Sequence, residues 1–147
     1  MSAEIDGWLA AINAPTGIAR VNTDDRYVVR TDHTAAQDID GEVVVINFDT
    51  YHYYGLNRTG TAVWNLIAPG GRTVDEIAAA VATAFGVTPK LAMPHVMSLL
   101  TRLVDEGLAE KTAKTAESPA VLAPGGPYEV PSLEKHEKLD QLILSGE

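Results

Sequence analysis

Residues 42–57 read EVVVINFDTYHYYGLN, and this stretch decides the fold of the chain. It opens with a β-branched run from Val43 to Ile46, a composition that favours a strand. Asp49 and Thr50 then form a short connection, and the aromatic run Tyr51–Leu56 predicts a second strand. Because two strands joined by so short a connection pair antiparallel, this stretch predicts a β-hairpin.

A third strand is predicted immediately upstream. Residues 26–38 begin with Tyr27, Val28 and Val29 and continue as a more polar sequence, which indicates one long, partly exposed strand. Asp40-Gly41 separates it from Glu42 and is a strong turn signal. The three strands together predict an antiparallel meander.

Two helices are predicted after the meander. Asn57 or Thr59 can cap a helix that runs to about Ile67 and buries one apolar face, which includes Trp64. Residues 73–76 read TVDE, a capping box at the start of a second helix that Gly86 ends.

A third helix follows Thr88-Pro89, which combines an N-cap with proline at the first helical position. Pro94 leaves two alternatives: either the regular helix begins near Met93, or its first turn is distorted. Gly107 closes the helix, and residues 108–111 are expected to return as a short wing strand.

The two ends of the chain are expected to be appendages to this domain. Residues 1–19 hold a short amphipathic helix with its stripe at Ile5, Trp8, Leu9 and Ile12, which packs on the body or docks on a partner. Residues 20–112 form the domain, and the Ala-, Thr-, Pro- and Gly-rich segment 113–127 is expected to be a flexible linker. Residues 128–147 form a tail in which apolar residues return.

The charge balance argues against nucleic acid as a partner. Lys and Arg total 11 against 20 acidic residues, which gives a net charge of −9, whereas nucleic-acid binders neutralise phosphates with basic side chains. The alternative of a DNA-reading winged helix would need a basic third helix, but Lys90 and Arg102 are outnumbered there by acidic residues. A peptide or protein partner is therefore expected.

No pattern indicates catalysis, a metal or a cofactor. The chain has no cysteine, and its histidines, which are His33, His52, His95 and His136, lack metal-ligand spacing. No nucleophile elbow or phosphate-binding loop is present. We also expect no signal peptide and no membrane span, and hence a cytoplasmic protein.

The order and spacing of several short motifs resemble the PqqD family. These motifs are YYxLN at residues 53–57, with Gly55 at its variable position, TGxxxW from Thr59 to Trp64, and LxxxGL from Leu103 to Leu108. The resemblance covers roughly residues 20–112. It implies an α+β, winged-helix-like fold: a three-stranded antiparallel sheet followed by three helices, with the N-terminal helix and the C-terminal tail added.

The resemblance also implies a function. Such domains, called RiPP recognition elements, bind the leader segment of a ribosomally made precursor peptide and present it to a modifying enzyme, such as a radical-SAM enzyme, a cyclase or a leader protease. The leader is implied to add as a strand to the third strand of the sheet, with its side chains facing the third helix.

An edge strand and a neighbouring helix flank would supply such a site. An edge strand offers unpaired backbone groups to any peptide, so side chains must provide the selectivity. If Leu56 faces the core, Tyr54 and His52 share its side of the strand. The residues expected to bind peptide are Tyr51, His52, Tyr53, Tyr54, Met93, Met97, Thr101 and Val104.

The tail carries a second resemblance. Tyr128, Pro131 and Leu133 match the Y-x-x-P-x-L leader motif of lasso-peptide precursors, although His136-Glu137 stands where that motif continues to a glycine. We therefore expect the tail to occupy the groove of its own chain or of a neighbouring chain. Docking into a neighbour would give a homodimer, so a self-associating module is the alternative function.

Overall fold

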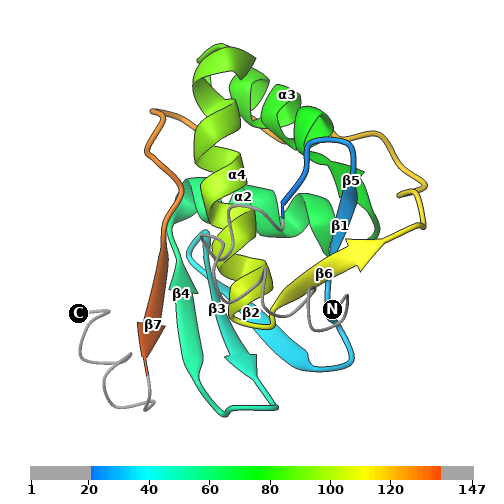
Figure 1. The fold of residues 1–147 in the computed structure, drawn as a ribbon. Coiled ribbons are helices and arrows are strands. Elements are labelled where there is room, and N and C mark those ends of the chain that lie inside the picture. The colour runs from blue at the N-terminus through cyan, green and yellow to red at the C-terminus, as the bar shows by residue number, and fades with distance from the viewer. Residues whose placement is uncertain (1–20, 137–147) are drawn as a thin grey trace, which may run out of the picture.

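The computed structural model describes residues 21–136, and Figure 1 shows their arrangement. Those residues form three helices and seven strands, and the strands make up two small antiparallel sheets. The predicted N-terminal helix and the last part of the tail lie outside the described residues. The mixed α and β architecture confirms the predicted fold class.

The predicted meander is present as strands β2 (Thr34–Ile39), β3 (Glu42–Asn47) and β4 (Tyr53–Leu56). Every second residue of β3 is buried, as its β-branched run predicts. Asp40 and Gly41 both have positive φ, which suits the twist of the tight hairpin between β2 and β3. The connection from β3 to β4 is longer than predicted, because the amide of Tyr51 donates to the carbonyl of Asn47 and closes a wider turn.

The prediction of one long strand over residues 26–38 is wrong. The chain forms β1 (Arg26–Val29), turns, and enters β2 in the other sheet. The amide of His33 donates to the carbonyl of Arg30 at 2.9 Å, and the Thr34 hydroxyl donates to the same carbonyl at 3.0 Å. These local bonds close a turn, so the chain changes direction between β1 and β2.

The second sheet has β1 in its centre. One neighbour is the two-residue β5 (Arg72–Thr73), and the other is β6 (Ala109–Thr112), which is the predicted wing strand. In Figure 1 this sheet lies on one side of the long helix α4, while β4 and its outer neighbour lie on the other.

The three predicted helices are α2 (Arg58–Ile67), α3 (Val74–Phe85) and α4 (Pro89–Asp105). Asn57 caps α2, and the capping box of α3 is complete, with Thr73 and Glu76 each bonded to the other's backbone. Helix α4 begins at Pro89 and continues through Pro94, so the alternative of a start near Met93 is wrong. Pro94 lies on the exposed face, where the loss of one backbone donor is tolerated.

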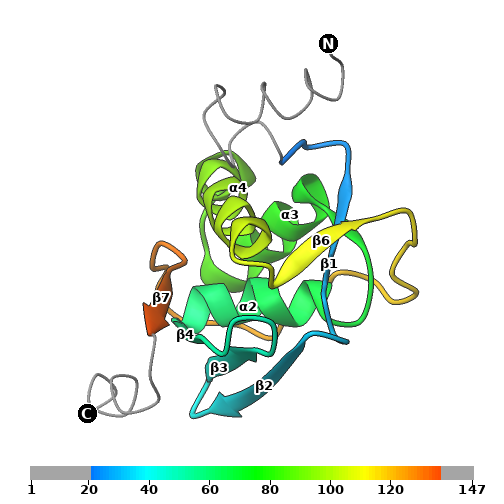
Figure 2. The same ribbon diagram turned by 60° about the horizontal axis from the view of Figure 1, so that its bottom comes forward.

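The core is formed where the helices meet both sheets. Trp64 of α2 is buried there together with Tyr27, Tyr54 and the apolar face of α4. No single helix within residues 21–136 is long and apolar enough to cross a membrane, although α3 and α4 meet that test jointly as a pair bent by 120°. Figure 2 shows α4 lying above α2, with α3 beside it.

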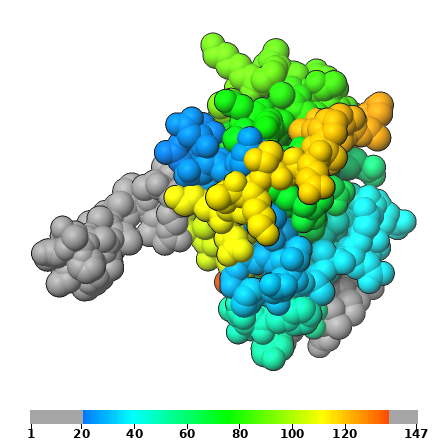
Figure 3. Space-filling model, turned by 90° about the vertical axis from the view of Figure 1, so that its right-hand side faces the viewer, coloured from blue at the N-terminus to red at the C-terminus, as the bar shows by residue number. Residues whose placement is uncertain are grey.

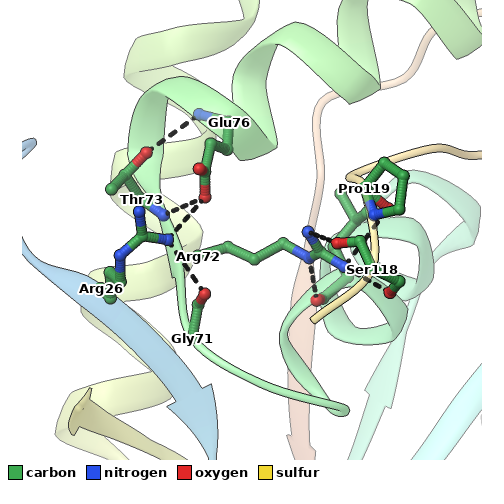
Figure 4. Close-up of polar contacts among 8 residues, drawn as sticks. Arg26, Gly71, Arg72, Thr73, Glu76, Ser118 and Pro119 are labelled. Atoms are coloured by element: carbon green, nitrogen blue, oxygen red, sulfur yellow. Dashed lines mark hydrogen bonds and ion pairs between the residues drawn. The ribbon is translucent and has the colours of Figure 1, made fainter. Parts of the chain in front are cut away.

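Residues 113–127 cross the helical half without regular structure (Figure 3). Arg72, which is only 4% exposed, bonds this segment through the Ser118 carbonyl at 2.9 Å and the Pro119 carbonyl at 3.4 Å (Figure 4). Its Nε also donates to the Leu66 carbonyl at 2.6 Å, so the buried guanidinium has hydrogen-bond partners, as a buried charge requires. That the segment is a flexible linker stays a prediction.

The same segment makes two further backbone contacts with the body. The amide of Ala116 donates to the carbonyl of Gly71 at 2.9 Å, and the amide of Gly125 donates to the carbonyl of Ala84 at 2.8 Å. A side chain at Gly71 or Gly125 would collide with Lys114 or Phe85, respectively. This course carries the chain from the end of β6 to the edge of the other sheet.

Candidate functional site

Strand β4 lies at the edge of the β2-β3-β4 meander, and its side chains alternate as the sequence predicts. Tyr54 and Leu56 are buried on the core side, whereas Tyr53 faces the opposite side. There Tyr53 helps to line a shallow depression together with residues of β2 and β3, which are Ala35, Ala36, Gln37, Val44 and Ile46.

The strand is two residues shorter than predicted. Tyr51 lies in the preceding turn with φ 62° and is 68% exposed, and His52 lies outside β4. The Nδ1 atom of His52 is buried without a hydrogen-bond partner among the described residues. The wider turn after β3 explains the difference, because it takes up both residues.

A segment of the tail pairs with the free edge of β4. Strand β7 (Leu133–His136) runs antiparallel to β4, with Leu133 opposite Leu56 and Lys135 opposite Tyr54. The meander therefore becomes a four-stranded sheet in the order β2-β3-β4-β7, and Figures 1 and 2 both show β7 at its edge. The tail thus satisfies backbone groups that an edge strand otherwise leaves free.

Asn57 fixes the entry of this segment. Its Nδ2 donates to the Val130 carbonyl at 2.8 Å, its Oδ1 accepts from the Ser132 amide at 3.0 Å, and its amide donates to the Ser132 carbonyl at 3.3 Å. The same Oδ1 accepts from the amide of Gly60 at 2.8 Å and so caps α2. One side chain therefore both starts the helix and holds the docked backbone.

Gly60 permits the close approach of that backbone. A Cβ atom at this position would lie 3.0 Å from the Ser132 carbonyl oxygen and 3.0 Å from Cδ2 of Leu56. Such contacts are tighter than ordinary packing allows, and both Leu56 and Asn57 are held in place. The glycine of the TGxxxW motif thus has a physical role at the docking edge.

Helix α4 supplies the other wall of the site. Nδ1 of His95 lies 2.7 Å from the Tyr128 hydroxyl, and the two rings stack with centroids 5.9 Å apart. Tyr128 also meets Phe85 edge-on, with ring centroids 6.2 Å apart. Lower on the helix, Arg102 donates to the carbonyl of Leu133 at 3.2 Å.

Glu106 forms the polar end of the site. Its Oε1 accepts from the Tyr54 hydroxyl at 2.9 Å and lies 3.1 Å from Nζ of Lys135. Burial alone would raise the pKa of Glu106, but the hydrogen bonds from Tyr54 and Lys135 and the positive charges of Lys135 and Arg102 outweigh it, so its pKa lies below the ordinary value. Burial, together with the bond to Glu106, raises the pKa of Tyr54 and keeps its hydroxyl protonated.

The three leader-like residues of the tail all lie against the body. Pro131 and Leu133 are buried, and Tyr128 is half-buried, with its pKa raised by burial. Residues 128–132 do not form a regular strand, so the chain bends and both Tyr128 and Leu133 reach α4. The exposed Glu129 lies between them.

The structure does not bring the predicted helix residues to this site. At about 100° per residue, His95 and Arg102 lie within about 20° of each other around α4, and the C-cap residue Glu106 follows on the same side. Met93, Met97 and Val104 lie about 160–200° away from His95. Thr101 lies about 120° away, and its hydroxyl donates to the Met97 carbonyl at 2.8 Å. These four residues are partly buried on the other flank of the core stripe, and their role in peptide binding stays a prediction.

The sequence held a signal for the helix residues that the prediction missed. His95, Arg102 and Glu106 are spaced i, i+7 and i+11, which places polar side chains on one helix face. No group of three or more His, Asp or Glu side chains gathers as metal ligands anywhere between residues 21 and 136.

Two comparisons bear on this arrangement. Residues 42–109 match the family model described as coenzyme PQQ synthesis protein D, PqqD. This segment is similar to PqqD, and the match covers slightly less than half of the chain. The segment holds β3, β4 and all three helices, and the docked tail lies outside it.

The comparison with solved structures points to the same kind of domain. The chain is similar to TbiB1, whose structure is described as a complex with the TbiA(beta) leader peptide, with 27% sequence identity and a TM-score of 0.53. The match covers 58% of this chain and 98% of the TbiB1 chain. No curated protein matches the chain. The family match and the structural match both agree with a winged-helix-like recognition element.

Proposed function

We propose that this chain binds the leader segment of a ribosomally synthesised precursor peptide by strand addition to β4. The observation that carries the proposal is that β4, flanked by α4, already accepts an extended segment in antiparallel register. The TbiB1 complex supports it, because a protein of similar fold holds a leader peptide. Main-chain bonds would provide affinity, and side-chain contacts with α4 would provide selectivity.

The chain would then present the bound leader to a modifying enzyme, such as a radical-SAM enzyme, a cyclase or a leader protease. A docked strand leaves the rest of the precursor free to enter a separate active site. The chain itself would act as a peptide-binding subunit without turnover.

Fluorescence anisotropy with synthetic leaders of the precursors encoded by neighbouring genes tests the binding step. In a chain whose tail is weakened by Tyr128→Ala and Leu133→Ala, so that loss of the tail contact cannot offset the effect, Arg102→Ala should weaken leader binding, because the leader would take the place of the strand whose carbonyl Arg102 bonds. Lys90→Ala is the matched control, since it removes the same charge from α4 on a face turned away from β7. Equal effects of the two substitutions would contradict this site.

Mass spectrometry of the precursor tests the presenting step. A modifying enzyme whose gene neighbours the gene for this chain should process the full precursor faster when the chain is present. Processing that is independent of the chain would contradict presentation and leave the binding result intact.

A further inference from the structure

Residues 128–136 occupy the same edge that the proposed function assigns to the leader. One strand edge can pair with only one extended segment at a time. While β7 is paired with β4 over residues 53–56, an external peptide has no backbone groups to bond there. Binding of a leader therefore requires that the tail leave.

The docked tail is held at several separate points. Tyr128 is bonded to His95 and packed on Phe85, Asn57 makes three hydrogen bonds with the backbone of residues 130 and 132, and Lys135 is paired with Glu106. Between them Leu133 is only 6% exposed and packs into the main core. Apolar burial and polar pairing thus coincide along the same nine residues, as in a peptide ligand.

The segment before the tail delivers it to this edge in the same chain. Its bonds to Gly71, Arg72 and Ala84 follow the surface of the helical half to a point beside α4. A tethered ligand of this kind experiences an effective concentration of about 1 mM. Docking within one chain is therefore favoured over docking in a second chain at ordinary protein concentrations.

We propose that residues 128–136 are an intramolecular competitor that covers the leader-binding edge until a tighter leader displaces it. This inference rests on the proposed function. The tail would set an affinity threshold: if the free tail bound with a Kd of about 0.1 mM, tethering at about 1 mM would weaken an external peptide about tenfold. The tail would also protect an otherwise exposed strand edge from pairing with other chains.

The test uses the full chain and a fluorescent synthetic peptide that copies residues 127–136. The double variant Tyr128→Ala/Leu133→Ala weakens the tail and leaves β4 and α4 unchanged. It should bind the probe at least tenfold more tightly than the wild type. Glu129→Ala, an exposed tail substitution, is the matched control and should behave as the wild type. The affinity ratio should not change with protein concentration.

Equal probe affinity for the wild type and the double variant would overturn the inference, and so would a failure of the probe to bind either protein. A ratio that changes with protein concentration would also overturn it, because the tail would then dock between chains. Binding of a synthetic leader to the double variant decides the proposed function separately, whatever the probe does.

A second measurement keeps the inference testable if the double variant unfolds. In the wild-type chain, a saturating leader should increase amide hydrogen exchange at residues 132–135. Unchanged protection of those amides in the leader complex would overturn the inference.

Discussion

At the scale of single residues, Trp64 is a large side chain that α2 buries in the core. It is 4% exposed and belongs to the core that joins the helices to both sheets. Trp64→Ala removes a large buried side chain and leaves a cavity, so it should lower the free energy of unfolding by about 3–5 kcal/mol. Urea denaturation followed by circular dichroism measures this loss, and Trp64→Phe should lose less. A folded Trp64→Ala protein with an unchanged midpoint and altered leader binding would contradict a structural role.

Gly60 allows the tail backbone to approach α2 closely. Ala is the better helix former by up to about 1 kcal/mol, so Gly60→Ala would ordinarily stabilise α2. Here the added methyl group meets the backbone of residue 132, and we expect the tail to be displaced while the domain stays folded. Amide exchange at Asn57, whose N–H is bonded to Ser132, should increase.

The control for Gly60→Ala is Asn65→Ala, on the exposed face of the same helix. This substitution changes helix propensity without approaching the tail. Equal exchange rates at Asn57 in the two variants would show that Gly60 does not control the docked backbone.

At the scale of elements, the pairing of β7 with β4 should depend on pH through Glu106. Its pKa is lowered in the docked state, where Lys135 and Tyr54 bond it. Glu106 therefore contributes its full stabilisation of docking when the pH is above the pKa that it has without the tail. That contribution is lost as the pH falls through the lower pKa of Glu106 in the docked state. Because the pair is partly exposed, we expect an effect of at most about 1 kcal/mol.

Protection factors of the Asn57 amide, measured between pH 7 and pH 3.5, test this expectation. Protection should fall on the acid side in the wild type. Lys135→Met removes the partner charge and should flatten the profile. A variant that retained the full wild-type pH dependence would show that another group is responsible.

The elements also show what the sequence can and cannot predict. The caps of α2 and α3, the Asp40-Gly41 turn and the alternation in β3 and β4 were predictable, because each depends on residues that are close in sequence. The division of residues 26–38 between two sheets was not, because strand partners are chosen by the whole chain. The spacing of His95, Arg102 and Glu106 places polar side chains on one helix face, but it does not show that the tail lies against that face, because this depends on the position of β7.

At the scale of the whole molecule, the helical half and the last segment of the chain are joined through Arg72. The sequence GGR at residues 70–72 predicts only a turn, yet the buried guanidinium holds residues 118 and 119 and so orders the route to β4. No pattern in the sequence indicates that Arg72 holds residues 118 and 119, because an arginine beside two glycines is typical of exposed loops. Motif order, by contrast, predicted the PqqD-like domain, since the family pattern combines many local constraints.

The central claim is that a leader adds to β4 beside α4, and intermolecular nuclear Overhauser effects between a labelled chain and a synthetic leader test it most directly. We predict contacts from the leader backbone to Tyr53–Leu56 and from its side chains to His95 and Arg102. Contacts confined to α3, or to the outer edge of β2 with β7 still paired to β4, would contradict the account.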